Sequence, residues 1–222
     1  MKKCYIFVIQ YYNSKRMAKK LYLFASLVSI IMAVATTACG KTSNTKTEKV
    51  DGVEWNISVR KAVQFNDPQT GINTDNNYTV ADTASVNEKL LSVKPENLTL
   101  DWTIPNTDGT IWLVAYESEP ILSEKVSVTE ANSIPSYGGN IQISFKLSDA
   151  EKWATITREN IGKRLAVFVN DQLMNAPKVN SEIESGRCSV SIPANMVKDF
   201  LPNIDLEKIK PVSYTHLRAH ET

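Results

Sequence analysis

The most regular pattern of apolar and polar residues lies between residues 139 and 201. The segment IQISFKL alternates apolar and polar residues, as a half-buried strand does. Apolar residues then recur at helical spacing as far as Gly162, a residue type that often ends a helix in the left-handed conformation. Three further strands, RLAVFV, QLMNAPKV and GRCSVSI, precede a helix that Pro193 opens. This order predicts an α+β fold, in which an antiparallel sheet carries helices on one face.

Local signals refine the bounds of these elements. Ser148 is placed to cap the helix, and Glu151, three residues later, closes a capping box. Asn170 and Asp171 suit a two-residue turn between two strands. Pro177 cannot donate to a ladder, so its strand is expected at an edge of the sheet.

Residues 51–110 form a less regular region of strands and loops. Residues 55–59 alternate as a half-buried strand, and residues 65–85 are so rich in Asn, Asp, Thr and Gly that they predict a long loop or a poorly ordered insertion. Residues 86–93 are expected to form a short helix. The segments LTLDWTI and TIWLVAYE, joined by PNTDG, predict a hairpin.

The N-terminal residues have the pattern of an export signal. Within residues 17–38, Lys19 and Lys20 are followed by an apolar core of about 15 residues and then by small residues before Cys39. That core is shorter than the roughly 20 residues that span a bilayer as a helix. Small residues before a cysteine resemble a bacterial lipoprotein signal, so Cys39 is expected to carry lipid and to hold the protein at the membrane.

The other terminal segments follow from this assignment. Residues 39–50 are interpreted as the lipidated cysteine and a flexible polar tether, and Lys41 without an early acidic residue favours a position facing the periplasm rather than the cell surface. Residues 1–16 are interpreted as a misannotated leader upstream of a start at Met17. Residues 211–222, which contain VSYTHLRAHET, match a translated sequencing adapter and predict a tail that is not native.

The charge, histidine and cysteine content reduces the number of possible partners and reactions. Lys and Arg number 25 against 24 for Asp and Glu, a balance that does not indicate a nucleic-acid partner. His216 and His220 both lie in the adapter-like tail, and no Cys/His metal site or cofactor is expected. Cys188 is interpreted as a small core residue. Without a phosphate loop, a dinucleotide fingerprint or a nucleophile elbow, the sequence does not predict an enzyme.

The segment FKLSDAEKWATITRENIGKRLAVFVNDQLMNAPKVNSEIESGRCSVSI, residues 145–192, carries a resemblance to a known family. It is similar to the head subdomain of the first large periplasmic domain of SecD and SecDF, the protein-export accessory subunits. The matching positions are Thr157, Gly162, Lys163, Ala176, Pro177, Ile183 and Gly186. The family's Asp-Gly turn is Asn170-Asp171 or Asp171-Gln172 here. The resemblance implies a SecD head-like domain over residues 111–210 that binds polypeptide in the periplasm.

Four residues are candidates for binding. Arg158 and Asn160 lie in a polar cluster at a helix end, and Asn175 and Pro177 lie at the expected sheet edge, where a peptide strand could add. The structural alternatives are a solvated helix end and a proline that protects an edge. Asp82-Thr83-Ala84 fits the short O-glycosylation pattern of Bacteroidota periplasmic proteins, with Thr83 as the acceptor.

The main hypothesis is therefore a lipid-anchored envelope domain that engages an envelope protein or unfolded peptide. A second hypothesis is a surface lipoprotein that binds carbohydrate through Trp55, Trp102 or Trp112, which requires exposed indole rings. A truncated protein-export subunit and a hydrolase with two close carboxylates of raised pKa are the remaining alternatives.

Overall fold

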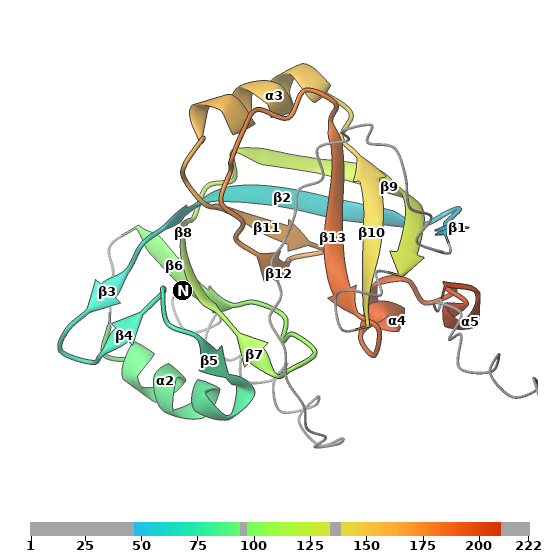
Figure 1. Ribbon diagram of the computed structural model, residues 1–222. Coiled ribbons are helices and arrows are strands. Elements are labelled where there is room, and N and C mark those ends of the chain that lie inside the picture. Colours follow the sequence, from blue (N-terminus) through green and yellow to red (C-terminus); the bar gives the residue numbers. More distant parts are fainter. Residues whose placement is uncertain (1–46, 94–96, 134–138, 210–222) are drawn as a thin grey trace, which may run out of the picture.

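The computed structural model describes residues 47–93, 97–133 and 139–209. The main sheet has nine strands, and its central path is β12-β11-β2-β9-β10-β13 (Figure 1). These six strands are β2 (Glu54–Val63), β9 (Leu122–Ser133), β10 (Asn140–Lys146), β11 (Leu165–Val169), β12 (Gln172–Asn175) and β13 (Arg187–Pro193). All the pairs along this path are antiparallel, as the sequence predicts.

The long strand β9 joins two parts of this sheet. Its first half pairs with β2 from Leu122 to Ser127, and its second half pairs with β10. The register with β10 shifts between Ser144 and Phe145, and such an irregularity increases the local twist. In Figure 1, β10 and β13 accordingly run across the direction of β2 and β11. The sheet is therefore strongly curled rather than flat.

The inner face of the curled sheet carries the main core. Buried residues of β2, β9, β10, β11 and β13 form one apolar cluster with three helices: α3 (Ala150–Glu159), α4 (Val197–Phe200) and α5 (Leu206–Ile209). Trp153 and Ile156 enter it from α3, Val197 and Phe200 from α4, and Ile209 from α5. The helices thus pack on one face of an antiparallel sheet, and the predicted α+β class is confirmed.

The order of elements from residue 140 to residue 200 also agrees with the prediction, with three local differences. Asp149 rather than Ser148 caps α3, accepting from the N–H of Lys152 at 2.8 Å, because the hydroxyl and N–H of Ser148 both bind the Glu124 carboxylate of β9. Pro193 ends β13 instead of opening a helix. The turn is Asn170-Asp171, and both residues have positive φ, as a type I′ turn requires.

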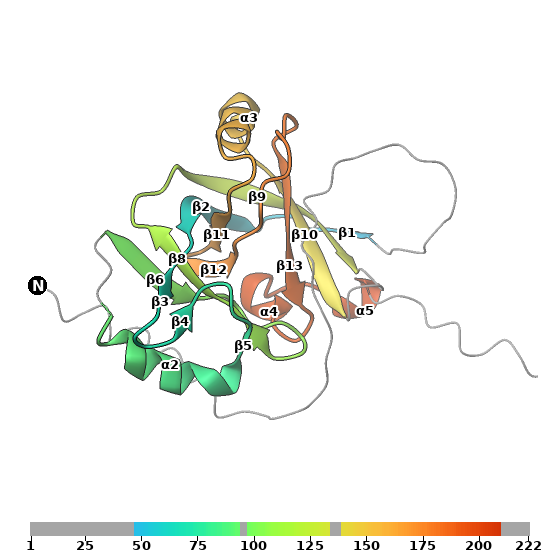
Figure 2. The ribbon, with the colours of Figure 1, turned by 60° about the vertical axis from the view of Figure 1, so that its left-hand side comes forward.

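The described residues between 64 and 117 form a smaller group of elements against the outer face of the sheet (Figure 2), and two of its strands belong to the nine-stranded sheet itself. The predicted hairpin is confirmed, because β6 (Leu98–Trp102) pairs with β8 (Leu113–Glu117), which also pairs with the end of β2. The expectation of a long loop or a poorly ordered insertion over residues 65–85 was wrong. That segment contains β3 (Asn66–Asp67), β4 (Ile72–Asn73), β5 (Tyr78–Thr79), the 3-10 helix η1 (Val80–Asp82) and the start of α2 (Thr83–Leu90), while β5 pairs with β7 (Thr110–Ile111).

A separate apolar cluster explains why this segment is ordered. Ile72 and Val86 pack with the buried Trp102, Ile111 and Leu113. The Trp102 indole N–H also donates to Asn87 Oδ1 at 2.8 Å, which ties α2 to β6. Polar composition hid this unit, because only a few widely spaced residues supply its core.

Candidate functional site

The two end strands of the central path, β12 and β13, differ in how their outer edges are used. On β12, the carbonyl oxygen of Leu173 accepts from the N–H of Ile104 at 3.1 Å. Just beyond β12, the carbonyl oxygen of Ala176 accepts from the Arg164 guanidinium at 3.0 Å. The edge that the sequence predicts at Pro177 therefore exists, but neighbouring segments cover part of it.

The edge of β13 is defined by its ladder with β10. The N–H of Ala194 donates to the carbonyl of Gly139, and the N–H of Leu147 donates to the carbonyl of Gly186. Both bonds fit the register in which Val190 opposes Ile143. In an antiparallel ladder, alternate residues point their peptide groups to opposite sides. The even-numbered residues of β13 therefore bond to β10, and the peptide groups of the odd-numbered residues point outward.

The outward groups of β13 are those of Arg187, Ser189, Ser191 and Pro193. The N–H of Arg187 donates to Ser185 Oγ at 3.3 Å, and Pro193 has no N–H. Within the described residues, the backbone groups of Ser189 and Ser191 have no partner on the outer side. Unpaired strand edges of this kind accept an added strand. The outer edge of β13 at Ser189 and Ser191 is the candidate site.

A small internal cavity of about 20 Å³ adjoins this edge. Its lining is mostly apolar and comes from the core and from both ends of the sheet: Ile57, Val59, Phe145, Leu147, Trp153, Val167, Asn175, Pro177, Cys188, Ser189 and Val190. The two ends of the sheet thus approach each other at the cavity, with β13 on one side and the segment after β12 on the other. A cavity of this size holds about one water-sized group.

Two polar atoms of the cavity-lining residues have no hydrogen-bond partner. They are the indole Nε1 of Trp153 and the amide Oδ1 of Asn175. The side chains are 1% and 5% exposed, so solvent does not supply a partner directly. Buried polar groups nearly always have a partner, and leaving one unpaired costs about 1–3 kcal/mol. Trp153 and Asn175 therefore each keep one unpaired polar atom within the buried part of the fold.

Cys188 also lines the cavity. Burial, with a smaller contribution from the negative charge of Glu124, raises the pKa of its thiol to about 12. A thiol with this pKa is almost entirely protonated at neutral pH and is a poor nucleophile. Cys188 packs against the main core, as expected from the sequence.

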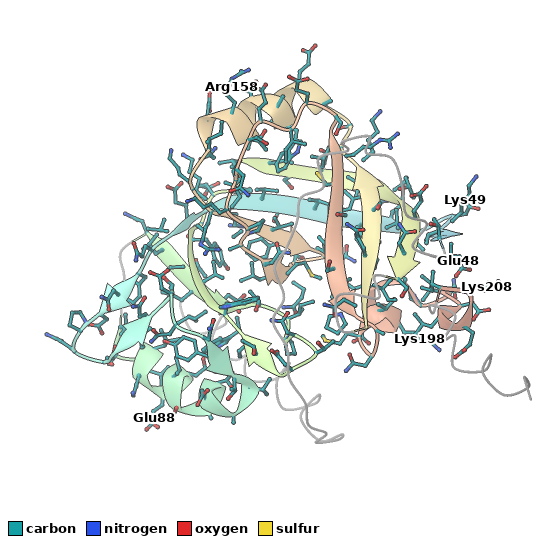
Figure 3. The ribbon with its side chains drawn as sticks, viewed as in Figure 1. Glu48, Lys49, Glu88, Arg158, Lys198 and Lys208 are labelled. Carbon is teal, nitrogen blue, oxygen red and sulfur yellow. The ribbon has the colours of Figure 1, made fainter. Side chains whose placement is uncertain are left out.

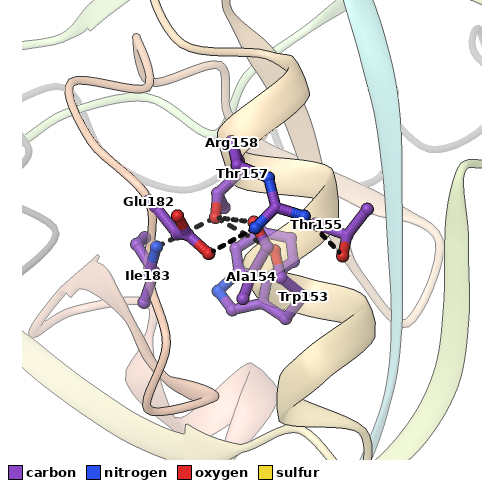
Figure 4. Close-up of polar contacts among 7 residues, drawn as sticks. All are labelled: Trp153, Ala154, Thr155, Thr157, Arg158, Glu182 and Ile183. Carbon is purple, nitrogen blue, oxygen red and sulfur yellow. Dashed lines mark hydrogen bonds and ion pairs between the residues drawn. The ribbon is translucent and has the colours of Figure 1, made fainter.

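The polar cluster at the end of α3 is tied into the fold. The Arg158 guanidinium forms an ion pair with Glu182 at 3.0 Å and donates to Thr155 Oγ1 at 3.3 Å, while its side chain stays 56% exposed (Figure 4). Arg158 points outward at the end of the molecule away from Lys198 and Lys208 (Figure 3). Asn160 is buried, and its amide donates to the carbonyl of Ile156 at 2.7 Å.

Thr157, which carries part of the family resemblance, has a structural role. Its hydroxyl lies within 3.0 Å of the carbonyl of Trp153 and accepts from the N–H of Ile183 at 2.9 Å (Figure 4). Gly162 and Lys163 bind the backbone of Val179 on both sides. These residues hold the connection between β12 and β13 against α3, and they position the free edge without reaching it.

The structure divides the four predicted binding residues. Arg158 is accessible, whereas Asn160, Asn175 and Pro177 are buried. Asn175 and Pro177 are buried and line the cavity, so their side chains do not present the exposed edge that was expected. A binding role for them stays a prediction. Sequence analysis missed the β13 edge. The serines that alternate with apolar residues in GRCSVSI, and the proline that ends it, are the signals that could have indicated an edge strand.

The structure leaves little room for carbohydrate recognition through the three tryptophans. Trp55 and Trp102 are buried at 1% and 8% exposure. Trp112 is half-buried, and its indole N–H donates to Asn77 Oδ1 at 2.9 Å. An aromatic platform on Trp55 or Trp102 is therefore excluded in this fold.

A polar cluster on the outer face bears on the hydrolase alternative. Burial raises the pKa of Asp101, and burial together with the Asp101 charge raises the pKa of Tyr116 to about 12. The Arg60 guanidinium lies 5.7 Å from the centroid of the Tyr116 ring. Among the described residues, Asp101 makes no hydrogen bond to a second carboxyl group, so the close carboxylate pair that the hydrolase alternative requires is not found there.

Thr83 lies at the start of α2 rather than in a loop. It is 7% exposed, and its hydroxyl donates to the carbonyl of Val80 at 2.8 Å. O-glycosylation of Thr83 stays a prediction, and it would require this hydrogen bond to break.

Two further expectations concern the membrane and metals. Cys39 lies outside the described residues. Within the described part of the chain, no helix is both long and apolar enough to cross a membrane. The same residues include no cluster of three or more His, Cys, Asp or Glu side chains placed to bind a metal ion.

The fold is a curled antiparallel domain with a free strand edge at β13. The residues of the family-like motif hold the connection that leads to this edge. Residues 103–198 match the family model described as SecDF, P1 head subdomain. The chain therefore contains a region that resembles the SecD head subdomain, as the sequence predicts.

Relatives named protein translocase subunit SecD are also similar to part of this chain. The sequence from Leptotrichia buccalis is 38% identical over 89 residues, which is 39% of this chain and 20% of that protein. The sequence from Aquifex aeolicus is 28% identical over 98 residues, 43% of this chain and 19% of the relative. The chain spans about a fifth of the length of these two curated relatives.

A solved structure described as "Structure and function of a membrane component SecDF that enhances protein export" is also similar. It is 20% identical and covers 63% of this chain and 56% of its own, with a TM-score of 0.32.

Proposed function

We propose that this protein is a lipid-anchored domain of the cell envelope that binds extended polypeptide at the outer edge of β13. The observation that carries the proposal is the unpaired backbone of Ser189 and Ser191. Backbone pairing does not depend on one side-chain sequence, so such an edge suits a partner that is unfolded or varied.

The alternation of buried and half-buried residues along β13 favours the addition of a strand over the docking of a folded protein surface. Val190 and Ile192 face the core, while Ser189 and Ser191 are half-buried. On this polar face, the Gln142 amide donates to Ser189 Oγ at 2.9 Å. An added strand would continue both faces, with one row of side chains toward the core and the other toward solvent.

The resemblance supports the same kind of partner. The relatives that are similar to part of this chain are named as protein translocase subunits. A role near exported polypeptides in the periplasm is our proposal for this chain. Attachment through Cys39 would keep the edge close to the membrane surface.

Proline at the β13 edge tests the binding site. Ser191→Pro removes an outward N–H and places a ring at the edge, yet it leaves the bonds to β10 intact, because the peptide groups of Ser191 point away from β10. We expect the affinity for Lys-flanked ten-residue peptides of alternating valine and threonine to fall at least about tenfold. Fluorescence anisotropy with the purified full-length chain measures this change.

The control is Ser191→Ala, which keeps the N–H and should bind as the parent does. Urea unfolding verifies that both variants remain folded. If the folded Ser191→Pro variant binds these peptides as tightly as Ser191→Ala, the β13 edge is not the binding site.

The anchor is tested separately in cells. We expect an alkyne analogue of palmitate to label the parent and to leave Cys39→Ser unlabelled, since Cys39 is the residue at which the signal pattern ends. Cys188→Ser is the matched control and should label like the parent. Equal labelling of Cys39→Ser and the parent would refute the anchor.

A further inference from the structure

Basic side chains gather on the outer face of the sheet, where β2, β11 and the segment after β12 lie side by side (Figure 1). Arg164, just before β11, lies opposite Lys178 in an antiparallel bridge. On its other side lies Ala62 of β2, which packs against the apolar cluster of the outer face. Opposed residues project to the same face, as do Ala62 and Arg60, two residues apart on one strand. Arg60, Arg164 and Lys178 therefore share the outer face, and we call them the outer basic patch.

The arrangement of the outer basic patch does not stabilise the fold. Opposed residues such as Arg164 and Lys178 have Cβ atoms about 4.5–5.5 Å apart, and like charges placed this way repel each other. Ala166 of β11 lies opposite Arg60, so Arg164 and Arg60 are diagonal neighbours, with Cβ atoms roughly 7 Å apart. Three positive charges are thus gathered in one place without a favourable effect on one another.

No acidic side chain neutralises the outer basic patch. Among the residues that the structure describes, none of its three cations forms an ion pair. The neighbouring Lys61, by contrast, lies 4.0 Å from the Glu117 carboxylate. Asp101 reaches the outer face from β6, but its carboxylate accepts from the backbone N–H of Trp102 and makes no ion pair with Arg60. The positive charge of the patch is therefore available to an anionic ligand.

Both arginines are held in place without losing their charge. The Arg60 guanidinium lies 5.7 Å from the ring centroid of Tyr116 and 5.4 Å from that of Phe168, and such rings attract a cation without neutralising it. The Arg164 guanidinium donates to the carbonyl of Ala176 at 3.0 Å. Side chains that are already positioned lose less entropy when a ligand binds. Carboxylates suit this patch, because guanidinium groups bind them through strong, charge-assisted hydrogen bonds.

We propose that the outer basic patch binds a carboxylate-rich segment of a polypeptide. Arg164 and Lys178 are exposed and contact the carboxylates, while the half-buried Arg60 adds its positive charge. The position of the patch favours a polypeptide over a lipid headgroup. Arg60 lies six residues after Glu54, about 20 Å along β2, and β1, through which the chain from Cys39 enters, lies beyond the Glu54 end. This choice of partner rests on the proposed function, because it uses the anchor at Cys39.

Two peptides of equal length test the inference. We expect the full-length chain to bind a six-residue glutamate peptide, labelled with an uncharged dye, about tenfold more tightly than the glutamine peptide in fluorescence anisotropy. The difference should shrink between about 50 and 300 mM salt, because salt screens exposed charges. Arg164→Gln combined with Lys178→Gln should weaken binding of the glutamate peptide about five- to tenfold.

The matched control is Lys49→Gln combined with Lys198→Gln, which removes two exposed charges near β1 and α4 (Figure 3) and should bind like the parent. Urea unfolding verifies that both double variants are folded. Lys178→Gln alone keeps the hydrogen bond of Arg164 and should still weaken binding about two- to threefold, so the test does not depend on the double variant.

The outcomes separate this inference from edge binding at β13. Equal binding of the two peptides by the parent, or equal losses in the two double variants, would overturn the inference. Binding of phosphatidylglycerol vesicles through Arg164 and Lys178, without binding of the glutamate peptide, would also overturn it and identify a lipid headgroup as the ligand. The valine–threonine peptides should bind the Arg164→Gln, Lys178→Gln variant as they bind the parent, so either proposal can fail while the other stands.

Discussion

Replacement of Trp55 by alanine is expected to destabilise the protein by about 3–5 kcal/mol, the range for removing a large aromatic side chain from a core. Trp55 is 1% exposed, and its indole N–H donates to the carbonyl of Phe200 at 3.1 Å. Its ring also packs edge-on against Phe145 and Phe200, with centroid distances of 6.1 and 6.4 Å. The substitution thus removes the contact that joins β2 to β10 and α4.

Urea unfolding followed by circular dichroism measures this loss. Trp112→Ala is the matched control, because Trp112 is half-buried on the outer face and outside the main core. We expect it to cost about 1–2 kcal/mol, near the centre of the range for single substitutions. Equal losses in the free energy of unfolding for the two variants would contradict a central position of Trp55 in the main core.

The second large effect is expected at Gly186, the residue just before β13. Its φ is +63°, and a Cβ built there would lie 3.1 Å from the Cβ and 3.3 Å from the Cα of Ala150. Gly186→Ala therefore combines backbone strain with a close contact at the start of α3. We expect a loss of about 2–4 kcal/mol, since each of these effects costs on the order of 1–3 kcal/mol.

Gly162→Ala isolates the strain. Gly162 has a φ of +83°, but a Cβ there meets nothing within 4 Å, so its loss should be only about 1 kcal/mol. Urea denaturation midpoints of the two variants, at equal m-values, give the difference. A loss at Gly162 as large as that at Gly186 would contradict the proposed contact with Ala150. Because the carbonyl of Gly186 accepts from Leu147, the Gly186 variant should also disturb the β13 edge.

Local patterns were sufficient for elements whose signal lies within a few residues. The alternation of residues 55–59 and of IQISFKL indicated β2 and β10. Gly162 has the expected left-handed conformation, but α3 already ends at Glu159 with Asn160 as its C-cap. The twelve-residue β9 was not predicted as a strand. It pairs with β2, β1 (Thr47–Lys49) and β10 along different parts of its length, and β1 and β2 lie far from it in the sequence.

The candidate site also has one feature that a local pattern indicated and others that depend on distant residues. Pro177 correctly indicated an end strand, because a missing N–H is a property of one residue. The sequence could not show that Ile104, about 70 residues earlier, bonds to Leu173 and covers part of that edge. It also could not show that Glu124 occupies Ser148 and moves the helix cap to Asp149.

By itself, the sequence determined the α+β class, the resemblance to the SecD head and the position of the type I′ turn. These depend on periodicity, motif spacing and backbone preferences, all of which act over short distances along the chain. Only the tertiary structure decided that Asn175 and Pro177 turn inward and that Ser189 and Ser191 remain unpaired. Which peptide groups stay free depends on the register of strands that meet from distant segments, and no local pattern encodes that register.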